Sequence, residues 1–221
     1  MIGDLFRRMS DVERPESLSN RLRNRRFRHF ENLCSRLPRP LSILDIGGTA
    51  EFWEQRGWAD RQDIQITLLN LFPASRIHGR VLSVVGDATD LSGFPDQSVD
   101  IVFSNSVIEH LFDREHQKRM ANEVVRVGRD YWLQTPNRWF PMEPHFQVPL
   151  WQFLPRSLRV RILMKRQCGR RGPCGTREEA ERLIDEVSLL TRGELEAFFP
   201  DALIVPERLG GLVKSWIVHS R

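Results

Sequence analysis

The sequence predicts an α/β fold around a mostly parallel sheet, and three observations carry this prediction. Short apolar runs typical of buried strands alternate with helical segments from residue 41 onward. The first of these strands runs directly into the glycine pair Gly47-Gly48 and then into a helix start. A segment rich in proline and aromatic residues, 138–155, interrupts the alternation after the fifth strand. The chain is therefore expected to form one α/β domain with an insertion after the fifth strand.

The composition is that of a globular protein. The 221 residues are 40% hydrophobic and 28% charged, and a chain of this length buries a full core without disulfides or metals. No stretch approaches the roughly 18 apolar residues that a membrane span needs, and residues 1–8 lack the apolar run of a secretory signal. We therefore expect a cytoplasmic protein without a transmembrane segment. Its three cysteines are expected to be free thiols rather than metal ligands.

A helix is expected before the first strand, with Ser19-Asn20 as its capping signal and apolar spacing that continues to about Leu37. The first strand follows at residues 41–46, and its acidic residue, Asp45, comes two positions ahead of the first glycine. In a dinucleotide-binding fingerprint the acid instead follows the glycines by about twenty residues. The order of acid and glycine is therefore not that of a dinucleotide site.

Three further motifs follow in order. Ile64–Asn70 and Val81–Ala88 look like the second and third strands, and the third ends in a Gly-Asp-Ala tripeptide. Residues 96–111 read as the fourth strand with the turn after it. Together with the first strand and its glycine turn, these motifs resemble class I S-adenosylmethionine-dependent methyltransferases, including the small-molecule branch of the ubiquinone and menaquinone type. The resemblance covers residues 41–111 and implies a Rossmann-like methyltransferase fold with S-adenosylmethionine as the cofactor.

The remaining elements complete this pattern. A helix at about 114–127 leads to a fifth strand at 131–135, and two closing strands at 202–205 and 214–219 resemble the antiparallel end of methyltransferase sheets. The expectation is a seven-stranded, mostly parallel sheet with an antiparallel last strand and a cap inserted after the fifth strand. Within the single domain 1–221 we expect an N-terminal helical segment, a cofactor-binding core, a substrate cap insertion, and a closing helix with strands: 1–40, 41–137, 138–190 and 191–221.

The resemblance implies cofactor-binding residues after the first four strands: Asp45, Gly47, Gly48, Asn70, Asp87, Ala88, Asn105 and Ser106. Asp45 is expected to orient the loop and the ammonium group of the cofactor, with the two glycines at its methionine tail. Asn70 is expected to meet the ribose, and Asp87 to accept from the adenine amino group beside Ala88. Asn105 and Ser106 are expected near the transferring methyl group. For Asp87 the alternative is a simple turn residue after a strand.

Three residues depart from the family pattern. Thr49 and Glu51 stand where the family has its second and third glycines, and Asn70 replaces an acid that accepts hydrogen bonds from both ribose hydroxyls. A β-branched residue does not easily take positive φ, and an amide brings no charge. These departures favour weaker cofactor binding, and they predict that Asn70→Asp tightens it.

His110 is the leading candidate for a catalytic base, because it follows the fourth strand beside Glu109 and histidine titrates near neutral pH. The alternative is that His110 only caps or packs the next helix. Glu143 and His145 in the cap are further candidates. The predicted catalytic residues are thus His110, Glu109 and His145. A metal-dependent reaction that uses His110, Glu143 and His145 is an alternative, but no metal ion is expected because the spacing of these groups requires none.

The expected activity is methyl transfer to a small-molecule, lipid or saccharide acceptor, a reaction that needs proximity and sometimes a base. Basic clusters at 14–28 and 156–171 indicate an anionic or lipid-linked acceptor, peripheral contact with a membrane surface, or only a solvated face. An RNA methyltransferase and a non-catalytic binding domain are the alternatives. Nucleic acid is disfavoured as a partner, because the Asn/Asp-Pro-Pro-Tyr/Phe tetrapeptide of enzymes that methylate exocyclic amines is absent.

Overall fold

A computed structural model describes residues 18–77 and 79–221 of the chain, which forms two compact units divided between Arg39 and Pro40. The first unit contributes α2 (Leu18–Cys34). This helix includes Ser19 and Asn20, so the cap expected at these residues is wrong. It ends before the expected Leu37, whose amide instead donates to the Cys34 carbonyl oxygen (3.2 Å) and closes a turn.

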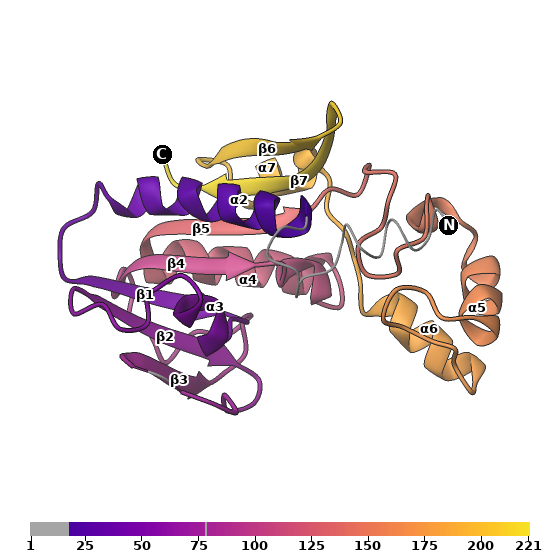
Figure 1. The fold of residues 1–221 in the computed structure, drawn as a ribbon, viewed down its shortest axis with the longest axis horizontal. Coiled ribbons are helices and arrows are strands. Elements are labelled where there is room, and N and C mark those ends of the chain that lie inside the picture. Colours follow the sequence, from indigo (N-terminus) through magenta and orange to yellow (C-terminus); the bar gives the residue numbers. More distant parts are fainter. Residues whose placement is uncertain (1–17, 78) are drawn as a thin grey trace. The chain divides into compact units, whose positions relative to one another are not determined.

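The second unit is built on a seven-stranded sheet with the order β3-β2-β1-β4-β5-β7-β6 (Figure 1). Its strands are β1 Leu41–Ile46, β2 Ile64–Asn70, β3 Val81–Val85, β4 Val99–Asn105, β5 Gly128–Pro136, β6 Leu203–Leu209 and β7 Leu212–His219. The strands β1 to β5 pair in parallel, and β7 pairs antiparallel with both β5 and β6. The predicted fold class, a mostly parallel methyltransferase-type sheet with an antiparallel closing hairpin, is confirmed.

The helical elements of this unit are α3 Ala50–Glu54, η1 Ile108–His110, α4 Arg114–Val127, η2 Trp151–Phe153, α5 Arg156–Lys165, α6 Arg177–Asp185 and α7 Arg192–Phe198. Side-chain caps set the start of three of these helices. The side chains of Asp113, Thr176 and Thr191 accept a hydrogen bond from a first-turn amide of α4, α6 and α7, respectively. Thr191 also closes a full capping box with Glu194.

The sheet core and the cap have separate apolar clusters. Val102 of β4 and Leu133 of β5 pack with Met120 and Val124 of α4. The cap cluster lies between η2, α5 and α6, with the rings of Phe146 and Trp151 stacked at 4.4 Å between centroids. Part of the aromatic content of 138–155 therefore fills the cap's own small core, as burial of apolar surface requires.

The end of the cap returns along the carboxyl end of β4. Helix α6 stops at Asp185, although apolar residues continue at helical spacing to Leu190, and residues 186–190 run on as an extended connection. The Ser188 amide donates to the Glu109 carbonyl oxygen (2.7 Å), and Gln117 donates its side-chain amide to the Ser188 carbonyl oxygen (2.8 Å). The connection therefore fixes the position of the turn after β4. Among the described residues, no helix has the length and apolarity to cross a membrane.

Candidate functional site

A cavity of about 530 Å³ opens at the carboxyl ends of β1, β2, β3 and β4. This is the edge at which open α/β sheets bind ligands. Six of the residues predicted from the sequence line it: Gly47, Gly48, Asn70, Asp87, Ala88 and His110. Five do not: Asp45, Asn105, Ser106, Glu109 and His145.

The turn after β1 requires both of its glycines. Gly47 has φ +75°, and a Cβ there would lie 2.4 Å from Cγ2 of Val107. A Cβ on Gly48 would lie 1.7 Å from Oδ2 of Asp45. No larger residue fits either position without moving its neighbours, so the bare backbone of the turn forms part of the cavity wall.

Asp45 lies beneath this turn and is almost fully buried. Its Oδ2 accepts a hydrogen bond from the indole nitrogen of Trp53 (2.7 Å), whereas its Oδ1 has no hydrogen-bond partner among residues 18–77 and 79–221. Burial raises the pKa of this carboxyl to about 8, although the Trp53 bond acts in the opposite direction. Asp45, the acidic residue of the first motif, thus packs against the backbone of the glycine turn and has one oxygen without a hydrogen bond among the described residues.

The structure accommodates two of the departures from the family pattern. Thr49 has φ −127°, an extended conformation that any residue adopts, and its side chain accepts from the Phe52 amide as the cap of α3. Glu51 lies in the first turn of this helix, where a carboxylate is favourable. Neither position needs a glycine here, because the helix begins directly after Gly48.

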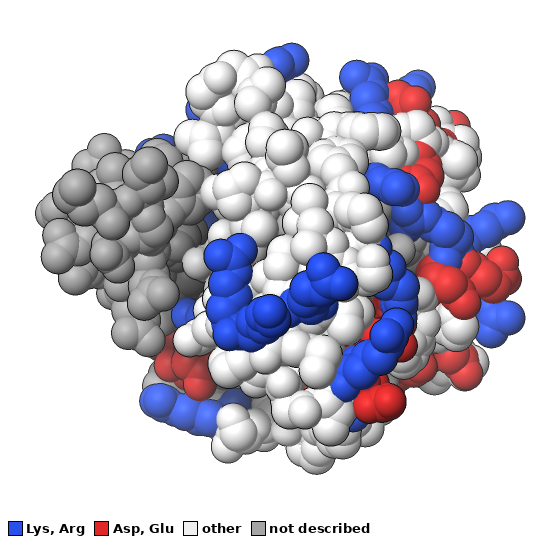
Figure 2. Space-filling model, turned by 90° about the vertical axis from the view of Figure 1, so that its right-hand side faces the viewer, with Lys and Arg blue, Asp and Glu red and all other residues white. Residues whose placement is uncertain are grey.

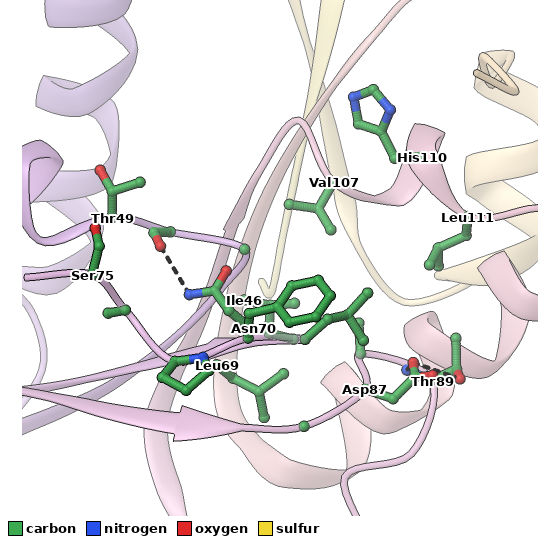
Figure 3. Close-up of a pocket in the computed structure, with 18 of the residues that line it drawn as sticks. Ile46, Thr49, Leu69, Asn70, Ser75, Asp87, Thr89, Val107, His110 and Leu111 are labelled. Carbon is green, nitrogen blue, oxygen red and sulfur yellow. Dashed lines mark hydrogen bonds between the residues drawn. The ribbon is translucent and has the colours of Figure 1, made fainter. Parts of the chain in front are cut away.

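Asn70 and Asp87 project from the ends of two neighbouring strands, as Figure 3 shows. The Asn70 side chain donates to the Gly48 carbonyl oxygen (3.1 Å), so its Nδ2 is already engaged. Oδ1 of Asp87 accepts from both the amide and the hydroxyl of Thr89, each at 2.8 Å. Asp87 therefore lines the cavity and is also the turn residue that the alternative interpretation described.

A buried polar cluster lies next to the cavity, behind His110. Glu109 is fully buried. Its Oε2 accepts from the Thr135 hydroxyl (2.9 Å), and its Oε1 has no hydrogen-bond partner within the described residues. Burial raises the pKa of Glu109, opposed by the charge of His145. His145 Nδ1 lies 2.6 Å from Oε1 of Glu143, whose Oε2 accepts from the Phe146 amide. The predicted catalytic residues of β4 and of the cap therefore meet here.

His110 connects this cluster with the cavity. Its ring packs edge-on against the ring of His145, with 4.7 Å between centroids, and its Nδ1 lies 3.2 Å from the Glu186 carbonyl oxygen. The surrounding protein desolvates the ring and lowers its pKa, and the charge of His145 acts in the same direction. A neutral imidazole at this position can accept a proton or donate a lone pair.

Two predicted residues, Ser106 and Asn105, lie outside the cavity wall, and three residues near the site were not predicted from the sequence. Ser106 has φ +62°, and its hydroxyl donates to the side chain of Gln134 (2.9 Å), while Asn105 ends β4 outside the cavity wall. Thr135 was missed, although its position at the carboxyl end of β5, the neighbour of β4, was a usable signal. Leu71 and Phe72, directly after β2, line the cavity and were also missed.

The residues present fit an S-adenosylmethionine-type ligand. The volume lies in the range of small-ligand sites, the glycine turn excludes side chains, and polar side chains on β2 and after β3 flank apolar ones. Asp45 does not line the cavity, and it contributes by supporting the backbone of this turn.

Comparison with known proteins agrees with this geometry. A family model described as "Methyltransferase domain" matches residues 47–130. Two uncharacterized proteins of Mycobacterium tuberculosis are 34% identical over 77 residues, which is 35% of this chain and 26% of theirs. The match thus spans about a quarter of the length of these relatives.

Solved structures extend the likeness over more of the chain. A methyltransferase of Methanosarcina mazei, described as SAM-dependent, is 16% identical with a TM-score of 0.52, covering 85% of this chain and 95% of its own. One from Aquifex aeolicus is 11% identical, with a TM-score of 0.50 and coverages of 88% and 87%. A "possible exported protein" of Bordetella parapertussis is 13% identical, with a TM-score of 0.59 and coverages of 99% and 78%. At such identities the likeness shows the fold.

The family match rests on the glycine turn, β2, β3 and β4, which together form the cavity. Residues 47–130 therefore resemble a methyltransferase domain, and the chain has the fold of solved methyltransferases that are described as SAM-dependent.

Proposed function

We propose that the protein transfers a methyl group to an acceptor that binds between the cavity and the cap, and that this acceptor is a small molecule, a lipid or a saccharide. The observation that carries the proposal is the polar cluster of Glu109, His110 and His145, which adjoins the cavity through His110. The likeness of residues 96–111 to the ubiquinone and menaquinone branch also supports a small-molecule acceptor.

The chain's own residues have separable roles in this proposal. Gly47 and Gly48 would hold the methionine tail, Asn70 the ribose through its free Oδ1, and Asp87 with Ala88 the adenine. When bound, the cofactor supplies an electrophilic methyl group on a sulfonium. The protein supplies orientation and a group that takes the proton of the acceptor.

The proton acceptor in the proposal is the histidine pair. Glu143 fixes the orientation of His145 by a 2.6 Å contact to Nδ1, and the Glu186 carbonyl does the same for His110. With the proton on Nδ1, Nε2 of each ring keeps the lone pair that a general base needs to accept a proton. Asn105 and Ser106 would act only through the shape of the turn after β4.

The cap surface supports an acceptor with apolar and anionic parts. Figure 2 views the side that carries α5 and α6, where Lys and Arg side chains cross a largely uncharged surface. Phe153, Leu158 and Met164 are exposed on this segment. Four exposed cations make no ion pair among the described residues: Arg161, Lys165, Arg166 and Arg170. Apolar groups among unpaired cations suit a lipid headgroup or an anionic membrane surface.

The function can be tested in two steps. First, calorimetry with S-adenosylmethionine and S-adenosylhomocysteine measures whether the cavity binds the cofactor. If neither compound binds, the protein is not a methyltransferase of this kind. Second, methyl-labelled cofactor is incubated with separated lipid, small-molecule and RNA fractions of a cell extract. Label in the lipid or small-molecule fraction, lost in Glu109→Gln, supports the proposal. Label in RNA alone would establish the alternative substrate, and cofactor binding without any transfer would favour a non-catalytic domain.

A further inference from the structure

Three side chains near the cavity form a set of potential metal ligands. One donor atom each from Glu109, His110 and His145 can be chosen such that all three lie within 4.8 Å of one another. Glu109 and His110 follow β4, whereas His145 belongs to the cap, so only the fold brings them together. Two imidazoles and one carboxylate are a common ligand set for first-row divalent metal ions.

Oε1 of Glu109 is an independent sign of a missing partner. The side chain is fully buried, and in the part of the chain that the structure describes Oε1 makes no hydrogen bond of good geometry, whereas Oε2 is held by Thr135. A buried acceptor without a partner destabilises the fold, because it has lost its hydrogen bonds to water without replacement. The other buried carboxylate of the cluster, Glu143, has both oxygens engaged. The unsatisfied oxygen is therefore specific to the residue that would ligate an ion.

Both histidines are fixed in the way that metal-ligating histidines usually are. Nδ1 of His145 lies 2.6 Å from the Glu143 carboxylate, and Nδ1 of His110 lies 3.2 Å from the Glu186 carbonyl oxygen. A histidine ligand commonly donates its other ring N–H to a carboxylate or a backbone carbonyl. In both rings this arrangement keeps the proton on Nδ1 and leaves the lone pair of Nε2 free.

We propose that Glu109, His110 and His145 bind one divalent first-row transition metal ion, such as Mn²⁺, Fe²⁺, Co²⁺ or Zn²⁺. Imidazole ligands favour these ions over Mg²⁺ and Ca²⁺, which prefer oxygen. Donor atoms bound to one such ion lie roughly 3 to 3.5 Å apart, so the side chains close by roughly 1.5 Å on binding. The coordination positions left open face an acceptor at the cavity, because His110 lines the cavity wall.

Three protein ligands leave room for an oxygen of the acceptor, and a bound cation lowers the pKa of a hydroxyl that it coordinates. With the ion bound, Nε2 of both histidines is occupied, so the coordinated hydroxyl gives its proton to water and activation by the cation replaces the general base of the proposed function. The site thus favours acceptors that carry a hydroxyl or phenol. This last step rests on the proposed function, whereas metal binding does not. The two can fail separately, because metal binding is measured without cofactor.

The test is a cobalt titration of the full chain, without a histidine tag and after treatment with chelator. We expect one equivalent of Co²⁺ to bind, with a visible d–d spectrum of nitrogen and oxygen ligands. Glu109→Gln and His145→Gln each keep the size of the cluster and should weaken binding at least tenfold. Glu143→Gln, which removes only the partner of His145, should weaken it about 10- to 100-fold.

His116→Gln is the matched control. His116 also lines the cavity but pairs with Asp113 outside the cluster, and its replacement should leave Co²⁺ affinity unchanged. Circular dichroism confirms that each variant is folded. A protein that binds no Co²⁺ at millimolar concentration would overturn the proposal. So would equal affinity in the folded Glu109→Gln and His145→Gln variants, or a thiolate charge-transfer band that places the ion on cysteine.

Discussion

The side-chain amide of Asn70 donates to the carbonyl oxygen of Gly48 at 3.1 Å. This bond joins the end of β2 to the glycine turn after β1, so the residue expected to meet the ribose also holds the backbone that is expected to meet the methionine tail. Asn70, one of the departures from the family pattern, is therefore coupled to the glycine turn through one hydrogen bond.

The first prediction concerns this bond. A carboxylate at position 70 cannot donate, and it would place an anionic oxygen against the Gly48 carbonyl. We therefore expect Asn70→Asp to weaken cofactor binding, the opposite of what the strand motif alone predicted. Loss of a hydrogen bond worth about 1 kcal/mol corresponds to about fivefold in Kd. Calorimetry with S-adenosylhomocysteine measures it, and Asn70→Ala serves as the reference. Tighter binding in Asn70→Asp would show that the ribose contact dominates.

The second prediction concerns the glycine turn. Gly47→Ala forces a β-carbon to 2.4 Å from Val107 at positive φ, whereas a β-carbon on Gly57, also at positive φ, would have no atom within 4 Å. Gly57→Ala should cost only the backbone strain, about 1 to 2 kcal/mol. Gly47→Ala adds a packing conflict of about 1 to 3 kcal/mol. In urea unfolding, the free energy of unfolding should therefore fall more in Gly47→Ala than in Gly57→Ala. Only Gly47→Ala should lose cofactor binding. Equal losses would contradict the geometry of the turn.

The third prediction concerns pH. Burial raises the pKa of Asp45 to about 8, so the folded protein holds this proton more tightly than the unfolded chain, where the ordinary value is 3.8. The contribution of Asp45 to stability is therefore complete at low pH and declines as the pH rises to about 8. Asp45→Asn cannot titrate and still offers Trp53 an acceptor. Its stability relative to the wild type should rise from about pH 5 to about pH 8 and then level off.

Thermal unfolding of the wild type and of Asp45→Asn, without cofactor and at several pH values from about 5 to about 8, measures this difference in stability. A constant difference across the range would mean that Asp45 is ionised throughout. The comparison between the two proteins cancels the titration of all other groups, which are common to both.

The fourth prediction concerns the cap surface. Replacing Arg161, Lys165 and Arg166 by Gln removes three unpaired cations and should abolish salt-dependent binding to vesicles with anionic lipid. Cofactor affinity should not change. The matched control is Arg119, Arg177 and Arg192 replaced by Gln, which removes the same charge from exposed arginines already paired with glutamates. If both triple variants bind vesicles like the wild type, the cap cations are only a solvated surface.

The local parts of this structure could be predicted from the sequence. Strand β1, its glycine turn and the helix after it are set by adjacent residues, as are the caps at Thr176 and Thr191. The closing hairpin and the insertion after β5 were also predicted correctly. The end of α6 was not, because residues 186–190 exchange helical hydrogen bonds for contacts with Glu109 and Gln117 that lie far away in the sequence.

The sequence by itself determined the fold class, the position of the cavity and the glycines that shape it, since each depends on backbone rules that act over a few residues. Only the tertiary structure decided how the site is assembled. It placed Asp45 under the turn rather than in the cavity, and it gave Asn70 its partner in Gly48. It also brought His145 from the cap to Glu109 and His110, which no spacing along the chain could show. Side-chain partners of this kind depend on how distant segments pack, and that packing is a property of the whole fold.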